Sequence, residues 1–142
     1  MQIASQRLFN FYAPSRLISG LSVADRRVGD VTLVDLRGRL TRGFGLQAFD
    51  DRVRFLVQEG ARSVAINLEQ VSDIDSSGFG GLAAAYNWVV QAGGQIKLFA
   101  PSERVRRTLN RLHFDKVIQI LNDQEAALRA FGAPASETPE SL

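Results

Sequence analysis

Short apolar runs alternate with amphipathic helical segments along most of this chain. Runs rich in apolar and β-branched residues predict strands, and apolar residues that recur every three or four positions predict helices. The expected strands are 21–24, 31–36, 63–68, 96–99 and 117–120, and the expected helices are 46–57, 79–90, 103–112 and 123–131. Strands that alternate with helices need crossover connections, hence a mostly parallel sheet that allows an antiparallel edge strand. We therefore expect a single α/β domain over residues 21–132, with about four helices.

The ends of the predicted elements carry residues typical of such positions. Gly60 follows the first helix where a C′ glycine is expected, and Gly93 ends the second. Ser102 is the expected N-cap of the third helix. The inner face of that helix is expected to carry Val105, Leu109 and Leu112. Gly38 and Gly43 are expected to bracket a loop before the first helix.

The two ends of the chain differ from its middle. Residues 1–20 contain apolar side chains but are interrupted by Pro14 and Gly20. This segment can be an arm packed on the domain, a partner-binding segment or an extension without a role, and we favour a weakly ordered arm. Residues 133–142 are rich in Pro, Ser and Glu, a composition typical of a disordered tail.

Composition excludes several kinds of site. The chain has no cysteine, which rules out disulfides, cysteine nucleophiles and thiolate–metal sites. His113 is the only histidine, so a metal site built from several histidines is ruled out as well. Near a predicted helix end, His113 is expected to be a C-terminal cap or a surface residue. We predict neither a metal nor another cofactor.

Charge and hydropathy limit the class of partner. The formal net charge is only +2, which argues against direct nucleic-acid binding. Four arginines cluster on the third predicted helix: Arg104, Arg106, Arg107 and Arg111. A solvated helix face is the simpler explanation of this cluster, and a docking patch for an acidic partner is the alternative. No run approaches the roughly 20 apolar residues of a membrane span, and no signal peptide is evident, so we expect a cytoplasmic protein without a membrane partner.

The most informative stretch is Asp75-Ser76-Ser77-Gly78-Phe79-Gly80-Gly81-Leu82, between a predicted strand and a predicted helix. Free backbone N–H groups and the positive end of the helix dipole gather at such a turn. The simplest explanation is a helix cap with a tight glycine turn. However, each glycine in a helix costs about 0.5–1 kcal/mol relative to alanine, which a cap alone does not require. Because ligands bind at the carboxyl ends of parallel strands, we favour a functional site here.

An enzymatic interpretation of this turn lacks the necessary residues. A nucleophile elbow needs G-x-S-x-G, and Ile74 stands two residues before Ser76. The Gly-Lys-Ser/Thr of a phosphate-binding P-loop is also absent. We therefore predict no catalytic residues at this turn.

In this order of elements, the chain resembles the STAS-domain family of bacterial anti-sigma-factor antagonists. The resemblance runs from Val31 to Phe131, and its most specific part is Ile66-Asn67-Leu68 followed by Val71 to Leu82. It is supported by 94–98, 105–109 and 112–114. The resemblance implies a STAS-like fold and a regulatory switch that is not an enzyme and has no catalytic residues.

The family resemblance also implies roles for residues of the turn. Ser76 would be phosphorylated by an anti-sigma factor that is itself a serine kinase. The contact surface for that partner would include Asp75, Ser77, Gly78, Phe79 and Thr41. The unphosphorylated antagonist would bind the kinase and free the sigma factor, and a serine phosphatase would reverse the modification. The oligomeric state stays open, a homodimer included.

One segment departs from the family pattern. The family often carries an acidic Gly-Glu-Leu-Asp-like segment after the second strand, where this chain has Gly38-Arg39-Leu40-Thr41. This segment is expected to lie near Ser76 and to make the local charge more positive, which bears on the choice of kinase and on whether Ser76 is phosphorylated. Two alternatives remain: a constitutive STAS scaffold subunit of a stress-signalling complex, and a small domain that binds a phosphate or nucleotide at the helix N-terminus.

Overall fold

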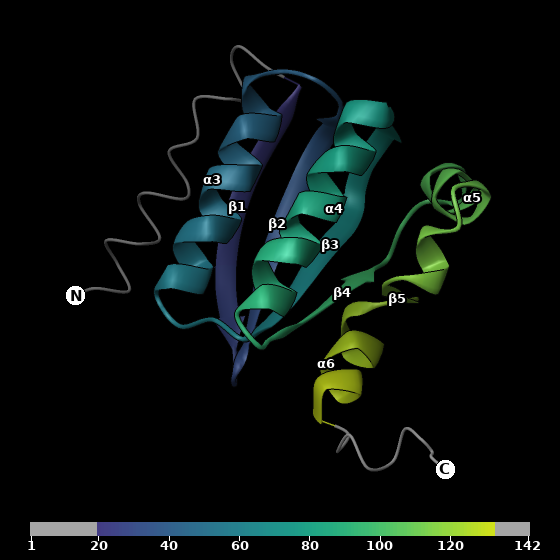
Figure 1. Cartoon of the computed structure of the whole chain (residues 1–142). Helices are drawn as coiled ribbons and strands as arrows, with labels where there is room; N and C mark the ends of the chain where they lie inside the picture. The colour runs from purple at the N-terminus through teal and green to yellow at the C-terminus, as the bar shows by residue number, and fades with distance from the viewer. Residues whose placement is uncertain (1–19, 133–142) are drawn as a thin grey trace.

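A five-stranded sheet runs through the whole domain (Figure 1). The computed structural model describes residues 20–132, so the predicted N-terminal arm, apart from Gly20, and the predicted tail at 133–142 lie outside the described residues. The strands are β1 (Leu21–Val28), β2 (Val31–Leu40), β3 (Ser63–Ile74), β4 (Gln95–Phe99) and β5 (Gln119–Leu121). The helices are α3 (Phe44–Gln58), α4 (Ser76–Gln91), α5 (Glu103–Arg111) and α6 (Gln124–Gly132), with a short 3-10 helix η1 (Phe114–Lys116).

The strands lie side by side in the order in which the chain makes them. β1 is antiparallel to β2, whereas β2, β3, β4 and β5 are mutually parallel. This confirms the predicted α/β fold, with its mostly parallel sheet, its antiparallel edge strand and, within residues 20–132, four α-helices. Across that same range, no helix has the length and apolar character needed to cross a bilayer.

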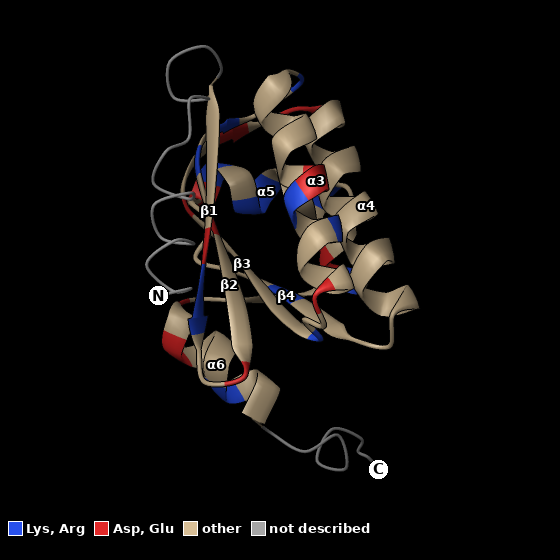
Figure 2. Ribbon diagram, turned by 90° about the vertical axis from the view of Figure 1, so that its left-hand side faces the viewer, with Lys and Arg blue, Asp and Glu red and all other residues tan. Residues whose placement is uncertain are grey.

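The helices cover the two faces of the sheet unequally. Because the parallel strands follow one another in sequence order, right-handed crossovers place α3, α4 and α5 on the same face. Their apolar sides pack on the sheet around fully buried residues such as Phe49, Leu82 and Leu109. Among residues 20–132, only α6 lies on the other face, as Figure 2 shows. Beneath it lies a smaller cluster of Val31, Leu33, Ala65, Phe99 and Ala127.

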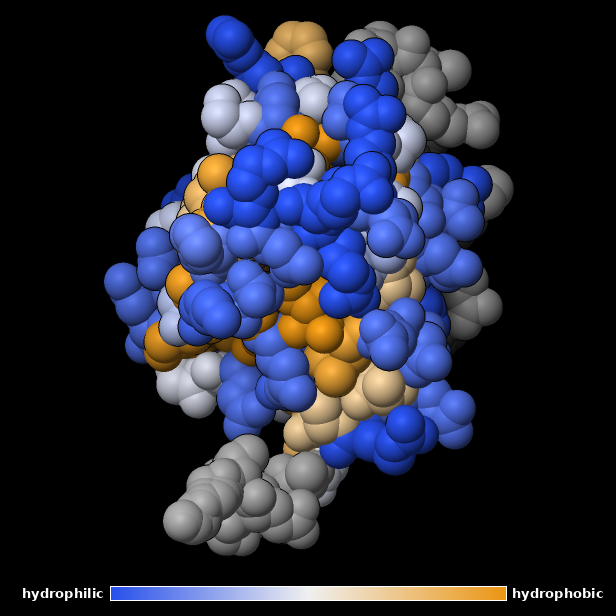
Figure 3. All heavy atoms as spheres, turned by 90° about the vertical axis from the view of Figure 1, so that its right-hand side faces the viewer, coloured by the Kyte–Doolittle hydropathy of each residue, from blue (hydrophilic) through white to orange (hydrophobic). Residues whose placement is uncertain are grey.

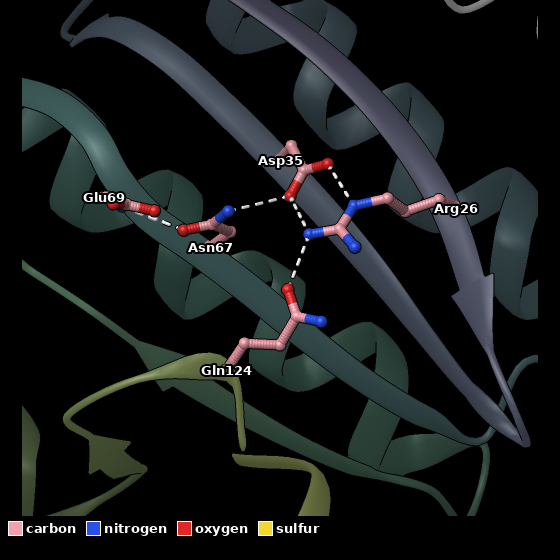
Figure 4. A network of polar contacts seen from close by, with 5 residues as sticks. All are labelled: Arg26, Asp35, Asn67, Glu69 and Gln124. Atoms are coloured by element: carbon pink, nitrogen blue, oxygen red, sulfur yellow. Dashed lines mark hydrogen bonds and ion pairs between the residues drawn. The ribbon is translucent and has the colours of Figure 1, made fainter. Parts of the chain in front are cut away.

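Polar contacts link α6 to the face of the sheet on which it lies (Figure 4). Arg26 on β1 pairs with the Asp35 carboxylate on β2 at 2.6 Å and donates a hydrogen bond to Gln124 of α6. The side-chain amide of Asn67 on β3 donates to Asp35 as well. The hydrogen bond with Asp35 raises the pKa of Arg26. Three strands and α6 therefore share one network.

β2 and β3 extend further than the sequence predicts. β2 continues through Gly38 to Leu40, so the expectation that Gly38 opens a loop is wrong. Gly38 has a φ of 113°, and a Cβ there would overlap the Gly20 carbonyl, so the close approach of two chain segments explains this glycine. β3 continues to Ile74, because buried side chains follow the predicted strand.

The segment after α5 differs from its prediction in two ways. Leu112 is 45% exposed, so its expected place on the inner face of α5 is wrong. The reason is that α5 ends at Arg111 and the chain turns at His113, whose φ is 61°, which leaves Phe114 to enter the core. The predicted strand 117–120 begins later, at Gln119, because η1 occupies Phe114–Lys116. His113 is exposed, as expected of a surface residue.

Candidate functional site

The N-terminus of α4 is capped by Asp75. Asp75 has extended backbone angles, and its Oδ1 accepts a hydrogen bond from the Gly78 N–H at 2.8 Å. Its Oδ2 accepts another from the Arg42 N–H at 3.3 Å, which joins the β2–α3 loop to this turn. The bond from Gly78 lowers the pKa of Asp75, and the bond from Arg42 acts in the same direction. Asp75 is therefore a charged cap that two segments share.

The two serine hydroxyls are left without a capping role. Ser76 is the first residue of α4 and is exposed, whereas Ser77 is half-buried. Neither hydroxyl has a hydrogen-bond partner among residues 20–132. Because the cap depends on Asp75, a group added to the Ser76 oxygen would break none of these bonds.

The three glycines of the turn meet different surroundings. A Cβ at Gly78 would overlap the carbonyl oxygen of Leu40, so glycine lets α4 approach the end of β2. A Cβ at Gly81 would press on the end of the Leu46 side chain, on α3. A Cβ at Gly80 would meet nothing within 4 Å. Internal packing thus explains Gly78 and Gly81, and only Gly80 is left as an unexplained glycine on the surface.

Phe79 is half-buried and links α4 to the segment after α5. Its ring meets the ring of Phe114 edge to face, with centroids 4.9 Å apart and planes at 66°. Phe114 is only 4% exposed, so this contact belongs to the core. Sequence reasoning did not anticipate this contact, because the two phenylalanines are separated by β4 and α5.

The segment Gly38–Thr41 lies beside the turn, as predicted. The Asp75 N–H donates to the Leu40 carbonyl at 3.3 Å, and Thr41 follows, half-buried. On the other side of the turn, Arg104 of α5 approaches Asp73 at 3.7 Å. The Arg42 backbone therefore contacts the Asp75 carboxylate, and the Arg104 side chain approaches the Asp73 carboxylate.

An exposed aromatic residue lies two positions beyond Arg42. Phe44 begins α3 and is 74% exposed, the most exposed large apolar side chain in the described part of the chain. The helical pattern on which the prediction rested starts at Leu46, so this residue had no assigned role. Phe44 therefore offers an exposed apolar side chain at the start of α3.

Metal ligands do not gather near this turn. Within residues 20–132, no three His, Asp or Glu side chains lie together in a way that could hold a metal ion. The chemistry that the described residues offer here is that of two serine hydroxyls, the carboxylates of Asp73 and Asp75, and the Arg104 guanidinium.

A family model for the STAS domain matches residues 22–127, which is most of the chain. This chain belongs to the STAS-domain family. The resemblance to this family is thereby confirmed, since the matched range runs from β1 to the first four residues of α6 and includes the whole Asp75–Leu82 turn.

Solved structures of anti-sigma factor antagonists have the same fold. A candidate anti-sigma factor antagonist from Thermotoga maritima is 22% identical, with 78% of this chain and 95% of that chain covered and a TM-score of 0.70. An anti-sigma factor antagonist from Mycobacterium paratuberculosis is 20% identical, with 80% of this chain and 95% of that chain covered, and also has a TM-score of 0.70. Phosphorylated SpoIIAA of Bacillus is 19% identical, with 77% of this chain and 99% of that chain covered, and has a TM-score of 0.61. These TM-scores show a common fold, and at identities this low they show the fold alone.

Proposed function

We propose that this STAS protein is an anti-sigma-factor antagonist that works as a partner switch. With Ser76 unmodified, the surface around the β3–α4 turn binds an anti-sigma factor that has serine kinase activity, and the sigma factor is freed. Phosphorylation of Ser76 ends this binding, and a serine phosphatase restores it. The protein acts in the cytoplasm as a regulator of sigma-factor-dependent transcription and catalyses no reaction itself.

The observation that carries this proposal is the division of roles between Asp75 and Ser76. Asp75 holds the helix N-terminus through Gly78 and joins it to Arg42, while the adjacent Ser76 hydroxyl is exposed and unbonded within the described residues. A kinase can therefore reach the oxygen, and the fold does not depend on it. The likeness to SpoIIAA, a protein solved in phosphorylated and unphosphorylated forms, agrees with a modifiable serine.

A phosphate on Ser76 would act on the complex and leave the fold intact. It adds a charge of about −1.5 to −2 at a helix N-terminus, where anionic groups are stabilised by about 0.3–1 kcal/mol. Inside an interface, the same phosphate would be desolvated close to Asp73 and Asp75, which lie in the same turn. Repulsion and desolvation together should remove several kcal/mol of binding free energy.

The proposed contact surface contains residues of two kinds. Asp75, Ser77 and Thr41 offer polar groups around Ser76. Gly78 is buried and Phe79 is half-buried, so we expect them to shape the surface more than to touch the partner. The exposed Phe44 completes the surface on the α3 side.

The test compares tagged baits in lysate of the native organism, with captured proteins identified by mass spectrometry. The baits are the natural chain, Ser76→Ala, Ser76→Asp and Ser72→Asp. Ser72 is an exposed residue of β3, so Ser72→Asp is a control that adds the same charge at another position. We expect the natural chain, Ser76→Ala and Ser72→Asp to capture an anti-sigma kinase that Ser76→Asp binds at least about a hundredfold more weakly. The purified partner with ATP should then modify the natural chain at Ser76.

Two controls give the result its meaning. The free energy of unfolding of Ser76→Asp should lie within about 1 kcal/mol of the natural chain, so that lost binding cannot be attributed to unfolding. Capture of one large assembly by all four baits, without regard to charge at position 76, would contradict the partner switch. That outcome would support a constitutive scaffold subunit.

A further inference from the structure

Positive charge is concentrated in residues 103–116, which span α5 and η1. This segment holds five of the chain's 17 Lys and Arg residues but only two of its 15 acidic residues, Glu103 and Asp115. The remainder of the chain has twelve basic and thirteen acidic residues. The basic character of the protein is therefore a property of one short segment.

Three of these arginines form a stripe on the outer side of α5. Arg104, Arg107 and Arg111 are spaced by three and four residues, which places them on one helix face, and we call them the arginine stripe. Val105 and Leu109 are fully buried on the opposite side, so the stripe faces outward. The Arg104 and Arg107 side chains are 70% and 65% exposed.

The arginine stripe is weakly engaged within the domain. Arg104 lies 3.7 Å from Asp73, and Arg107 lies 4.0 Å from Glu103. Within the described residues, Arg111 has neither an ion pair nor a hydrogen bond. Exposed pairs of this kind contribute at most about 1 kcal/mol, so a partner can displace them at little cost.

Exposed aliphatic side chains adjoin the arginine stripe. Leu112 follows Arg111 directly and is 45% exposed, and Val117, just after η1, is 50% exposed. Figure 3 shows the face on which α5 lies, with strongly hydrophilic side chains above an apolar area. Charged and apolar groups side by side are typical of a protein interface, with a polar rim and an apolar centre.

We propose that the arginine stripe, Leu112 and Val117 form a second docking surface, which binds an acidic protein segment that also carries apolar side chains. Charge complementarity selects an acidic partner, and the aliphatic groups offer apolar area for it to bury. Nucleic acid fits less well, because no aromatic side chain stands among the arginines to stack on bases. This surface goes beyond the proposed function and does not require Ser76 to be modified.

The proposed surface also meets the Ser76 turn. Arg104 is at the end of the stripe that contacts Asp73, three residues before Ser76. A partner bound at the turn can therefore place an acidic segment along α5. The test below uses isolated probes, so its result does not depend on the identity of that partner.

The experiment titrates the full ¹⁵N-labelled chain with three probes in physiological salt. The first probe is a synthetic peptide of alternating acidic residues and leucines, the second has serine in place of each leucine, and the third is an oligothymidylate of matched charge. We expect the leucine peptide to bind most tightly and to shift amide signals of α5 and η1. Reversing the stripe with Arg104→Glu, Arg107→Glu and Arg111→Glu should weaken this binding at least about tenfold. Ser76→Ala should leave it unchanged.

Matched variants separate this surface from general charge attraction. The control reverses three exposed arginines elsewhere, Arg27, Arg37 and Arg129, and should leave binding of the leucine peptide within about threefold. Leu112→Ser should weaken the leucine peptide but not the serine peptide. Equal binding of the two peptides, tighter binding of the oligothymidylate, equal losses in both arginine variants, or unchanged α5 and η1 signals would each overturn the proposal. Circular dichroism checks that every variant is folded.

Discussion

At the residue scale, neighbouring positions of the β3–α4 turn have separate physical roles. Asp75 is a cap, because its carboxylate receives backbone N–H groups from two segments. Ser76 is exposed beside it, and Gly78 fills a space in which no side chain fits. A sequence motif read as one unit therefore contains a structural part and a surface part. Single substitutions can separate the two.

Alanine substitutions at the turn glycines should have opposite effects. Gly78→Ala places a methyl group against the Leu40 carbonyl, which cannot move without distorting β2, so we expect a loss of about 2–3 kcal/mol in unfolding free energy. Gly80→Ala enters open space within the helix and should stabilise by about 0.5–1 kcal/mol. Urea unfolding measures both changes. For Gly81→Ala we expect a change in unfolding free energy between these two, because the Leu46 side chain can adjust to the added methyl group. Equal effects at positions 78 and 80 would contradict this account.

The Asp75 cap predicts a defined pH dependence of stability. The folded state lowers the pKa of Asp75, so its stabilisation is present above the ordinary value of 3.8 and is lost as the pH falls through the folded pKa. Asp75→Ala should therefore cost about 1 kcal/mol at neutral pH, and this difference should shrink below about pH 4. Urea unfolding across this pH range measures it. Asp75→Asn retains a capping oxygen, so it should lower the free energy of unfolding at neutral pH by less than Asp75→Ala does. If the cost of Asp75→Ala did not change with pH, the role of the charged carboxylate would be contradicted.

At the element scale, the helices differ in how firmly they are held. α3, α4 and α5 share one large apolar core with the sheet, and the Phe79–Phe114 contact connects α4 to η1. α6 rests on a small apolar cluster and on the contact between Arg26 and Gln124. Each helix should therefore be as stable as the interface on which it packs.

Native-state hydrogen exchange should resolve this difference. We expect amides of α6 to exchange through a local opening, with a lower free energy than amides in the centre of β3, which should exchange only on global unfolding. Gln124→Ala should increase exchange in α6 and leave β3 unchanged at low denaturant. Equal opening free energies for α6 and β3 would show instead that the two faces unfold as one unit.

At the scale of the whole molecule, the parallel strands bring the functional features to one edge. The ends of β2 and β3 and the starts of α3 and α4 meet at the Asp75 turn, where Leu40 and Arg42 bond to Asp75. The start of α5 joins the same edge through Arg104. The proposed switch and the proposed second surface are therefore adjacent, although most of α4 and all of β4 separate them in the sequence.

The amino-acid sequence alone determined the order of elements, the single α/β domain and the Asp75–Leu82 turn. These follow from local periodicity, from glycine and capping residues, and from a motif within one stretch of chain. Ser102, for example, caps α5 as predicted, since its Oγ accepts from the Val105 N–H. Such local patterns depend on neighbours a few residues away, which the sequence displays directly.

Only the tertiary structure decided which member of each motif is structural. Gly78 is required by Leu40, and Phe79 packs on Phe114, although 38 and 35 residues separate these pairs in sequence. Leu112 fitted the helical period yet is exposed, because the helix ends before it and Phe114 takes the buried place. Such outcomes depend on distant segments that compete for the same space, and folding alone brings those segments together.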